Sequence, residues 1–260
     1  MAISVKLSLA ALLLASCASV ASAADVVVAE PVAEQAVVEN TSGFYLGSFN
    51  GVTFFDNTDF NYQSRVGTPR NIPISQDYET GYYTAARLGY NFGAYSYVMP
   101  RIELEVGFGN SSVDHQINGG PVVADIDSFG DARTIQGYLN GYLDIPVMVG
   151  QTGFFSALTP YVGGGIGAMN LELRRQGVSS QGVVMDDDDT RFAYHLDAGV
   201  GISLDKTGVF PASTLFENTT LDVGYRYTAA DDFRLTSRDG TVSKTDFESH
   251  AVMFGLRKQF

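Results

Sequence analysis

The sequence lacks several features that would direct it to common classes of protein. Its 260 residues include no Trp, a single Cys and three His, and only 17% of them are charged, below the fraction of about a quarter that is usual for soluble domains. With one cysteine, Cys17, the chain has no disulfide of its own. Lys and Arg number 16 against 29 Asp and Glu, which gives a formal charge of −13. No basic cluster offsets that charge, so we expect no nucleic-acid partner.

Long apolar runs are confined to the start of the chain, which has the pattern of an export signal. Lys6 supplies one positive charge, residues 7–14 form an apolar core, and Ala21-Ser22-Ala23 is a small-x-small cleavage site. We expect a signal peptide over 1–23. Leu14-Ala15-Ser16-Cys17 resembles a lipoprotein signal, so lipidation of Cys17 and its removal with the signal peptide are alternatives. No later segment has 18 consecutive apolar residues, and we expect no transmembrane helix in the mature chain.

The rest of the chain divides into a short low-complexity segment and a long region of alternating residues. Residues 24–42 are rich in Ala, Val and Glu, and we expect them to be flexible. From Gly43 onward apolar and polar residues alternate, which is typical of strands with two unlike faces. We count eight such segments: 43–55, 81–93, 98–109, 132–145, 159–173, 190–204, 218–228 and 247–260.

The length of these segments and of their connections indicates a barrel. Each segment runs about 11–15 residues, whereas soluble strands run about 5–6 and tilted strands that cross a bilayer need about 9–11. The connections after the odd-numbered segments are expected to be long loops (56–80, 110–131, 174–189, 229–246), and the others are shorter. Long loops on one side are the outer-membrane pattern. We therefore predict an all-β protein, an eight-stranded antiparallel up-and-down transmembrane β-barrel over 43–260.

A soluble barrel has the same alternation with its faces exchanged, apolar inside and polar outside. Three features favour the membrane barrel. The strands are long, and their polar face is poor in Lys and Glu. The chain also ends on Phe260 inside a strand pattern, and an aromatic side chain is favoured at the rim of a membrane barrel.

Several short motifs resemble a known family. They are Gly43-Phe44-Tyr45-Leu46-Gly47, Leu88-Gly89-Tyr90-Asn91-Phe92, Arg101-Ile102-Glu103-Leu104-Glu105, 160–167 (PYVGGGIG), 222–227 (DVGYRY) and Gly255-Leu256-Arg257 before Phe260. Together they resemble the small bacterial outer-membrane β-barrels of the opacity-protein and surface-antigen group, close to the OmpA-type transmembrane domain. The resemblance spans roughly 43–260.

The resemblance implies a fold and a location in the Gram-negative cell outer membrane, among its lipids, but no single activity. It also implies that the barrel assembly machinery reads the last strand, here through Val252, Phe254, Leu256 and Phe260. Lys258 departs from the family pattern, which often has an aromatic residue there. With eight strands, both termini are expected on the periplasmic side.

Charged residues on the polar faces are the candidate functional residues of the lumen. They are Arg87, Arg101, Glu103, Glu105, Asp144, His195, Asp197, Asp222 and Arg226. Because the lumen of an eight-stranded barrel is just wide enough for side chains to fill it, we expect these groups to pair as a structural network. The alternative is that Glu103 and Glu105 are paired catalytic carboxylates.

Other candidates for chemistry are weaker. His195 and Asp197 lie two apart on one face, but the pair offers no hydroxyl nucleophile, and we expect no enzyme. Asp186–Asp189 is interpreted as a solvated acidic loop, with weak Ca²⁺ binding as the alternative. His115 and His250 have no Cys or second His at ligand spacing, so no zinc site is expected, and we expect no cofactor.

The predicted loops contain Asn57, Asn61, Tyr62, Pro69, Pro73, Tyr78 and Asp231-Asp232, a composition that suits a surface for recognition. We expect a structural or surface-interaction protein of antigen or adhesin type, with acidic extracellular loops, a side-chain-filled lumen and an unknown ligand. The alternative is a small passive porin-like channel.

Overall fold

The structure is a computed structural model that describes residues 42–63, 70–146, 153–207, 209 and 213–260. All of these residues belong to one compact unit. The predicted signal peptide and, apart from Ser42, the predicted flexible segment lie outside the described residues. In the described part of the chain, no helix is both long and apolar enough to cross a membrane.

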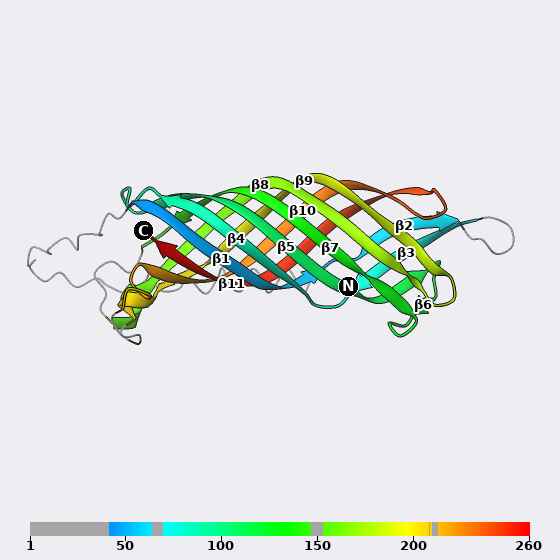
Figure 1. Cartoon of the computed structure of the whole chain (residues 1–260), viewed down its shortest axis with the longest axis horizontal. Helices are drawn as coiled ribbons and strands as arrows, with labels where there is room; N and C mark the ends of the chain where they lie inside the picture. The colour runs from blue at the N-terminus through cyan, green and yellow to red at the C-terminus, as the bar shows by residue number, and fades with distance from the viewer. Residues whose placement is uncertain (1–41, 64–69, 147–152, 208, 210–212) are drawn as a thin grey trace, which may run out of the picture. The chain divides into compact units, whose positions relative to one another are not determined.

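The described residues form one antiparallel sheet that closes on itself (Figure 1). Its strands are β1 (Gly43–Phe55), β2 (Thr58–Gln63), β3 (Asn71–Tyr78), β4 (Gly81–Asn91), β5 (Met99–Asn118), β6 (Val122–Val123), β7 (Ser128–Asp144), β8 (Leu158–Val178), β9 (Gly182–Ser203), β10 (Thr219–Thr236) and β11 (Val242–Gln259). Two short 3-10 helices, η1 (Gly153–Ala157) and η2 (Leu204–Lys206), also occur.

Eight strands make the closed ring, in the order β1-β4-β5-β7-β8-β9-β10-β11. β1 pairs with β4 on one side and with β11 on the other, so the first and last long strands join. Tyr45 lies opposite Gln259, and the N–H of Phe260 donates to the carbonyl of Phe44 at 3.0 Å. The predicted eight-stranded antiparallel barrel is confirmed.

One part of the barrel, here called the belt section, has apolar side chains outside and polar side chains inside. It comprises residues 44–54, 82–92, 100–108, 135–144, 160–168, 192–202, 221–227 and 250–258. In β4, for example, Tyr82 and Leu88 point outward and are about half exposed, whereas Arg87 is buried. This arrangement matches a wall that faces lipid, because apolar side chains need no hydrogen bonds there.

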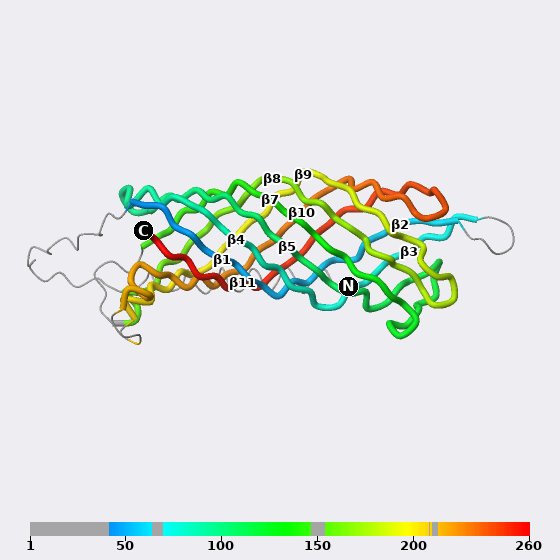
Figure 2. The backbone as a smooth tube through the Cα atoms, viewed as in Figure 1, coloured from blue at the N-terminus to red at the C-terminus, as the bar shows by residue number. Residues whose placement is uncertain are grey.

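The rest of the barrel, here called the distal section, is built from strands that run well past the belt. The predicted loops 110–131, 174–189 and 229–246 lie mostly within β5, β7, β8, β9, β10 and β11, and the prediction of long irregular loops there was wrong. Figure 2 shows these strands continuing along the barrel beyond the belt and ending in tight turns. Within the predicted loop 56–80, the described residues form β2 and β3, an antiparallel pair that lies between β1 and β4 in the chain.

The distal section is apolar inside and polar outside, the reverse of the belt section. Its core contains, among others, Phe60, Tyr62, Ile74, Tyr78, Met169, Leu171, Leu173, Met185, Phe233 and Leu235. Tyr62 and Tyr78 are therefore buried, and their assignment to a surface for recognition was wrong. β8 passes through both sections: Val162 and Ile166 face outward in the belt, and Leu171 and Leu173 face inward beyond it.

Side chains replace the backbone ladder at two seams of the distal section. The register of β9 with β10 runs as far as Ala193 and Ala230. Beyond this point the carboxylates of Asp189 and Asp187 accept the N–H groups of Arg234 at 2.7 Å and Thr236 at 2.6 Å. The Asp186–Asp189 run thus lies in strand β9 and satisfies the backbone of its neighbour, which corrects its interpretation as a solvated loop.

The second seam joins β2 to β11 in the same manner. The N–H of Asp59 donates to Thr245 Oγ1 at 3.2 Å, and the N–H of Asn61 donates to Ser243 Oγ at 2.8 Å. Because these bonds satisfy the outer edge of the hairpin, the distal section is closed around its core.

Candidate functional site in the barrel lumen

The structure places all nine predicted lumen residues inside the belt section, each at most 5% exposed. They come from five strands: Arg87 from β4, three residues from β5, Asp144 from β7, two from β9 and two from β10. Inward positions on neighbouring strands lie side by side because a closed barrel brings their faces together.

Six residues form a closed ring of alternating charge across the lumen. Arg87 contacts Glu103 at 3.6 Å and Asp222 at 3.1 Å. Arg101 contacts Glu103 and, through Nε at 2.9 Å, Asp144. Arg257 completes the ring at 3.2 Å from both Asp144 and Asp222. Three cations thus balance three anions, and each carboxylate has two arginine neighbours.

A second group, here called the Arg226 cluster, contains the other lumen charges. The guanidinium of Arg226 donates to Asp197 at 2.8 and 2.9 Å and to both carboxylate oxygens of Glu105. His195 Nδ1 lies 3.1 Å from Asp197, and its Nε2 lies 2.9 Å from Asn140 Oδ1. Asn140 in turn donates to Glu105 at 3.1 Å. The forked guanidinium between two carboxylates is the bidentate geometry that Arg favours.

Inward tyrosines supply the remaining donors of the lumen. Tyr45 donates to Glu103 and Tyr83 to Glu105, both at 2.7 Å, and Tyr142 donates to Asp197. The guanidinium of Arg101 also lies 4.0 Å from the centroid of the Tyr142 ring, within the range of a cation–π contact. These hydrogen bonds add to the arginine contacts of the same carboxylates, which lowers the cost of burying the charges.

Glycines make room for this packing. A Cβ atom on Gly165 of β8 would collide with Asn140 and His195, and one on Gly107 would collide with the ring of Tyr83. Close approach of neighbouring side chains is a common reason for glycine within a strand. The glycine-rich stretch 163–167 therefore has a packing explanation.

Sequence reasoning missed part of the network. Arg257 lies on the face of β11 opposite to the apolar Phe254 and Leu256. Its position in this alternation is the signal that could have identified it as a lumen residue. The inward tyrosines gave no comparable signal, because Tyr occurs on both faces of these strands: Tyr82 points outward and Tyr83 inward.

The chemistry of the lumen is that of paired, buried charges. Glu103 and Glu105, the potential catalytic pair, are each held by arginine. In the described part of the chain, the His195 ring has hydrogen bonds with Asp197 and Asn140, neither of which carries a hydroxyl. A small cavity lies beyond Arg226, lined in part by Thr53, Thr134 and Ser249.

The four residues of the predicted C-terminal signature lie on the outside of the barrel. Val252, Phe254 and Leu256 are 43–50% exposed, and Phe260 is 75% exposed. Lys258, which departs from the family pattern, donates through Nζ to the carbonyl of Thr214 at 2.7 Å. Its charge is thus engaged by the turn before β10.

A closed antiparallel barrel with an apolar outer belt and a charged interior defines a transmembrane β-barrel. The model of the outer membrane protein beta-barrel domain matches residues 9–260, and the chain belongs to that family.

Three known structures are similar to the chain at low identity. Neisserial surface protein A is 16% identical with a TM-score of 0.45, over 85% of this chain and 99% of its own. OprG from Pseudomonas aeruginosa is 16% identical with a TM-score of 0.44, over 84% and 96%. Ail of Yersinia pestis is 11% identical with a TM-score of 0.32, over 83% and 97%. The search of curated proteins finds no match.

Proposed function

We propose that this protein is a non-catalytic structural and surface-interaction component of the outer membrane, whose closed barrel holds the distal section outside the cell. In this arrangement both termini are periplasmic, because β1 begins and β11 ends at the end of the barrel opposite the β2–β3 hairpin (Figure 1). The last strand serves as the assembly signal through its outward apolar side chains. Recognition of other molecules occurs on the outer face of the distal section.

The occupied lumen is the observation that carries this proposal. The six-residue ring, the Arg226 cluster and the apolar distal core follow one another along the barrel axis. Ions in water cannot pass an apolar core packed from side chains such as Met169, Met185 and Phe233, which are completely buried. These successive barriers argue against the passive-channel alternative.

The outer face of the distal section supports the surface-interaction part. Exposed acidic residues lie on several of its strands: Asp59, Asp186, Asp188, Asp246 and Glu248. Some are paired with neighbouring cations, such as Asp186 with Arg238. A polar, mainly acidic surface favours partners of complementary charge, because electrostatic attraction guides the encounter.

Conductance in a planar bilayer tests the proposal. We expect no steady conductance from the folded protein, whose insertion is verified by a heat-dependent shift in gel mobility. A variant that removes bulk from all three barriers, Arg87→Ala with Arg226→Ala and Phe233→Ala, should conduct if it stays folded. Stable, reproducible channels from the unmodified protein would contradict the proposal and favour the channel.

The orientation is tested separately on intact cells. An epitope inserted after Gly240, in the turn between β10 and β11, should bind antibody without permeabilisation. An epitope placed after Phe260 should bind only after the outer membrane is opened. The reverse result would contradict the proposed orientation and leave the conductance test unaffected.

A further inference from the structure

An irregularity in the pairing of β3 with β5 brings three ligand-type side chains together. The antiparallel register of the two strands shifts just beyond Gln76. In the shifted stretch, Asp77 of β3 stands opposite two residues of β5, Asp114 and His115. Two residues against one is the geometry of a β-bulge, a feature that redirects side chains and is common beside functional sites.

The bulge gives Asp114 and His115 the same outward direction. Consecutive residues of a regular strand point to opposite faces. Here the flanking residues Val113 and Gln116 are both buried, and the two residues between them are both partly exposed. Gln76 donates through Nε2 to the carbonyl of His115 at 3.1 Å, which holds the bulge from inside the barrel.

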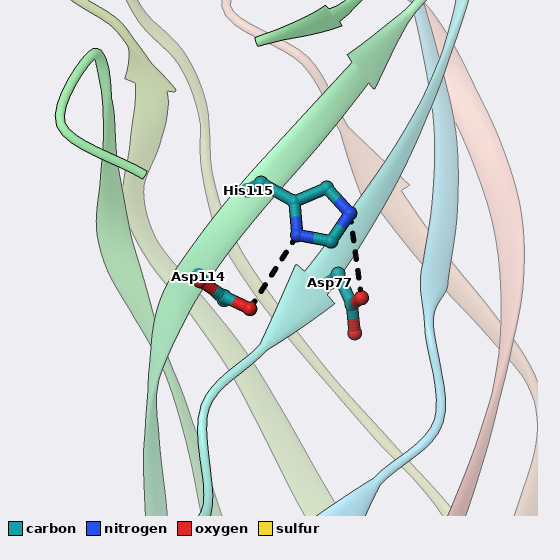
Figure 3. A group of neighbouring side chains, drawn as sticks. All are labelled: Asp77, Asp114 and His115. Carbon is teal, nitrogen blue, oxygen red and sulfur yellow. Dashed lines mark hydrogen bonds and ion pairs between the residues drawn. The ribbon is translucent and has the colours of Figure 1, made fainter. Parts of the chain in front are cut away.

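The distance between His115 and Asp77 matches two ligands of one metal ion better than a hydrogen bond. His115 Nε2 lies 3.4 Å from Asp77 Oδ2, whereas Asp114 Oδ2 lies 3.5 Å from the other ring nitrogen, Nδ1 (Figure 3). Because an imidazole binds one ion through one nitrogen, Asp114 joins Asp77 at Nε2 only after its carboxylate rotates. An N–H···O bond is usually about 2.7–3.2 Å long. Ligand atoms bound at about 2.0–2.1 Å around a tetrahedral Zn²⁺ lie roughly 3.4 Å apart.

The carboxylate of Asp77 is held toward the imidazole, and all three side chains can be reached from solvent. The N–H of Tyr78 donates to Asp77 Oδ1 at 3.0 Å, which leaves Oδ2 facing the imidazole. The side chains of His115, Asp77 and Asp114 are 29%, 35% and 45% exposed, so an ion can enter from solvent. One ligand atom from each residue can be chosen so that all three lie within 4.8 Å of one another. A modest side-chain rotation then brings them to bonding distance.

We propose that Asp77, Asp114 and His115 bind one divalent transition-metal ion of the Zn²⁺ type on the outer face of the distal section. Imidazole with carboxylates suits Zn²⁺ and its neighbours, whereas Ca²⁺ and Mg²⁺ take oxygen ligands. Two carboxylates balance the charge of the ion, and three protein ligands leave a fourth position for water or for a group on another molecule. The expectation of no zinc site at His115 considered only ligands near in sequence, whereas Asp77 comes from another strand.

Titration calorimetry of the full-length protein in detergent micelles with ZnCl₂ tests the site. We expect one ion per chain, unaffected by an excess of CaCl₂. His115→Asn and Asp77→Asn should each weaken binding at least tenfold. Two control variants should bind as the unmodified protein does: His250→Asn, which alters the outward histidine beside Tyr225, and Asp188→Asn, which alters an acid elsewhere in the distal section.

A second measurement needs no variant. Co²⁺ bound by one imidazole and two carboxylates in a four-coordinate site gives visible absorption bands, and Zn²⁺ should abolish them at one equivalent. Absence of Zn²⁺ binding at millimolar concentration, or full affinity in folded His115→Asn, would overturn the proposal. In that case the cluster is a charge pairing that only ties β3 to β5.

Discussion

The belt section and the distal section share six long strands, β5 and β7–β11, but have opposite insides. In the belt section the lumen contains a closed ring of six charges and the Arg226 cluster, and the outside is apolar. In the distal section the inside is an apolar core, and the outside carries residues such as Glu172 and Lys244. Along β8 the inward phase stays the same while its chemistry changes from glycine and tyrosine to Met169, Leu171 and Leu173.

The difference shows that the surroundings, and not the barrel topology, decide which face is apolar. Where the wall faces lipid, apolar side chains are favoured outside and the small lumen accommodates paired charges. Where the wall faces water, burial of apolar surface in the lumen is the stabilising term. The two sections should therefore respond differently to the same kind of substitution.

The largest effect is expected from unpairing a charge in the belt section. Arg226→Met leaves Glu105 and Asp197 buried without their main cation, which should lower the free energy of unfolding by about 3–5 kcal/mol. A urea titration followed by gel mobility measures this. Adding Glu105→Gln and Asp197→Asn to the same variant should restore part of the loss. No recovery would mean that packing around Arg226, and not its charge, is the main contribution.

The second-largest loss of stability is expected from removing a side chain of the distal core. Leu173→Ala deletes a completely buried side chain and leaves a cavity, with an expected loss of about 2–5 kcal/mol. Val242→Ala is the control, since Val242 is 63% exposed in the same section and should change stability by less than about 0.5 kcal/mol. Equal losses of stability in both variants would contradict the description of the distal section as apolar inside and polar outside.

A lysine on the outside should distinguish the two sections directly. Leu104 of β5 is 60% exposed in the belt, and Leu104→Lys should cost about 2–4 kcal/mol in a lipid bilayer. Ser112 has the same outward phase of β5 in the distal section, and Ser112→Lys should be nearly neutral. The free energy of folding into liposomes, measured in buffers of increasing urea concentration, gives the cost of both substitutions. Similar costs would place the edge of the membrane elsewhere on β5.

The smallest effect is expected at the seam between β9 and β10. Burial alone would raise the pKa of Asp189, but the N–H groups of Arg234 and Thr190 and the side chain of Arg191 hold that pKa below its ordinary value. The carboxylate thus stabilises the fold above the pKa of an unfolded Asp, and this contribution is lost as the pH falls through the folded-state pKa.

Asp189→Asn should therefore cost less than about 1 kcal/mol at pH 7, because the side chain is partly exposed. The difference from the unmodified protein should shrink in acid. Asp59→Asn, on an exposed carboxylate of β2, serves as the control. Stability curves between pH 7 and pH 3 measure the difference, and a constant gap across that range would contradict the role given to Asp189.

Most of the belt section was predictable because its signal is local. Alternation of apolar and polar residues gave eight segments and assigned inward residues such as Arg87 and Asp222 correctly. The distal section was not predictable in the same way. Its inward residues are apolar, so the apolar side chains move from the outward to the inward phase where a strand passes from the belt into the distal section. This change of phase was mistaken for the start of a loop. The Asp186–Asp189 run concealed strand β9 further, since acidic residues are uncommon in strands.

The sequence by itself determined the number of long strands and the two faces of each strand in the belt, because these depend on residues near one another in the chain. Only the tertiary structure decided which charges pair, which strands continue past the belt, and which side chains meet across strands. The ring through Arg87, Asp222 and Arg257, and the meeting of Asp77 with His115, depend on closure and on register. Both are set by long-range pairing, and a shift of a single residue would turn each of these side chains to the opposite face.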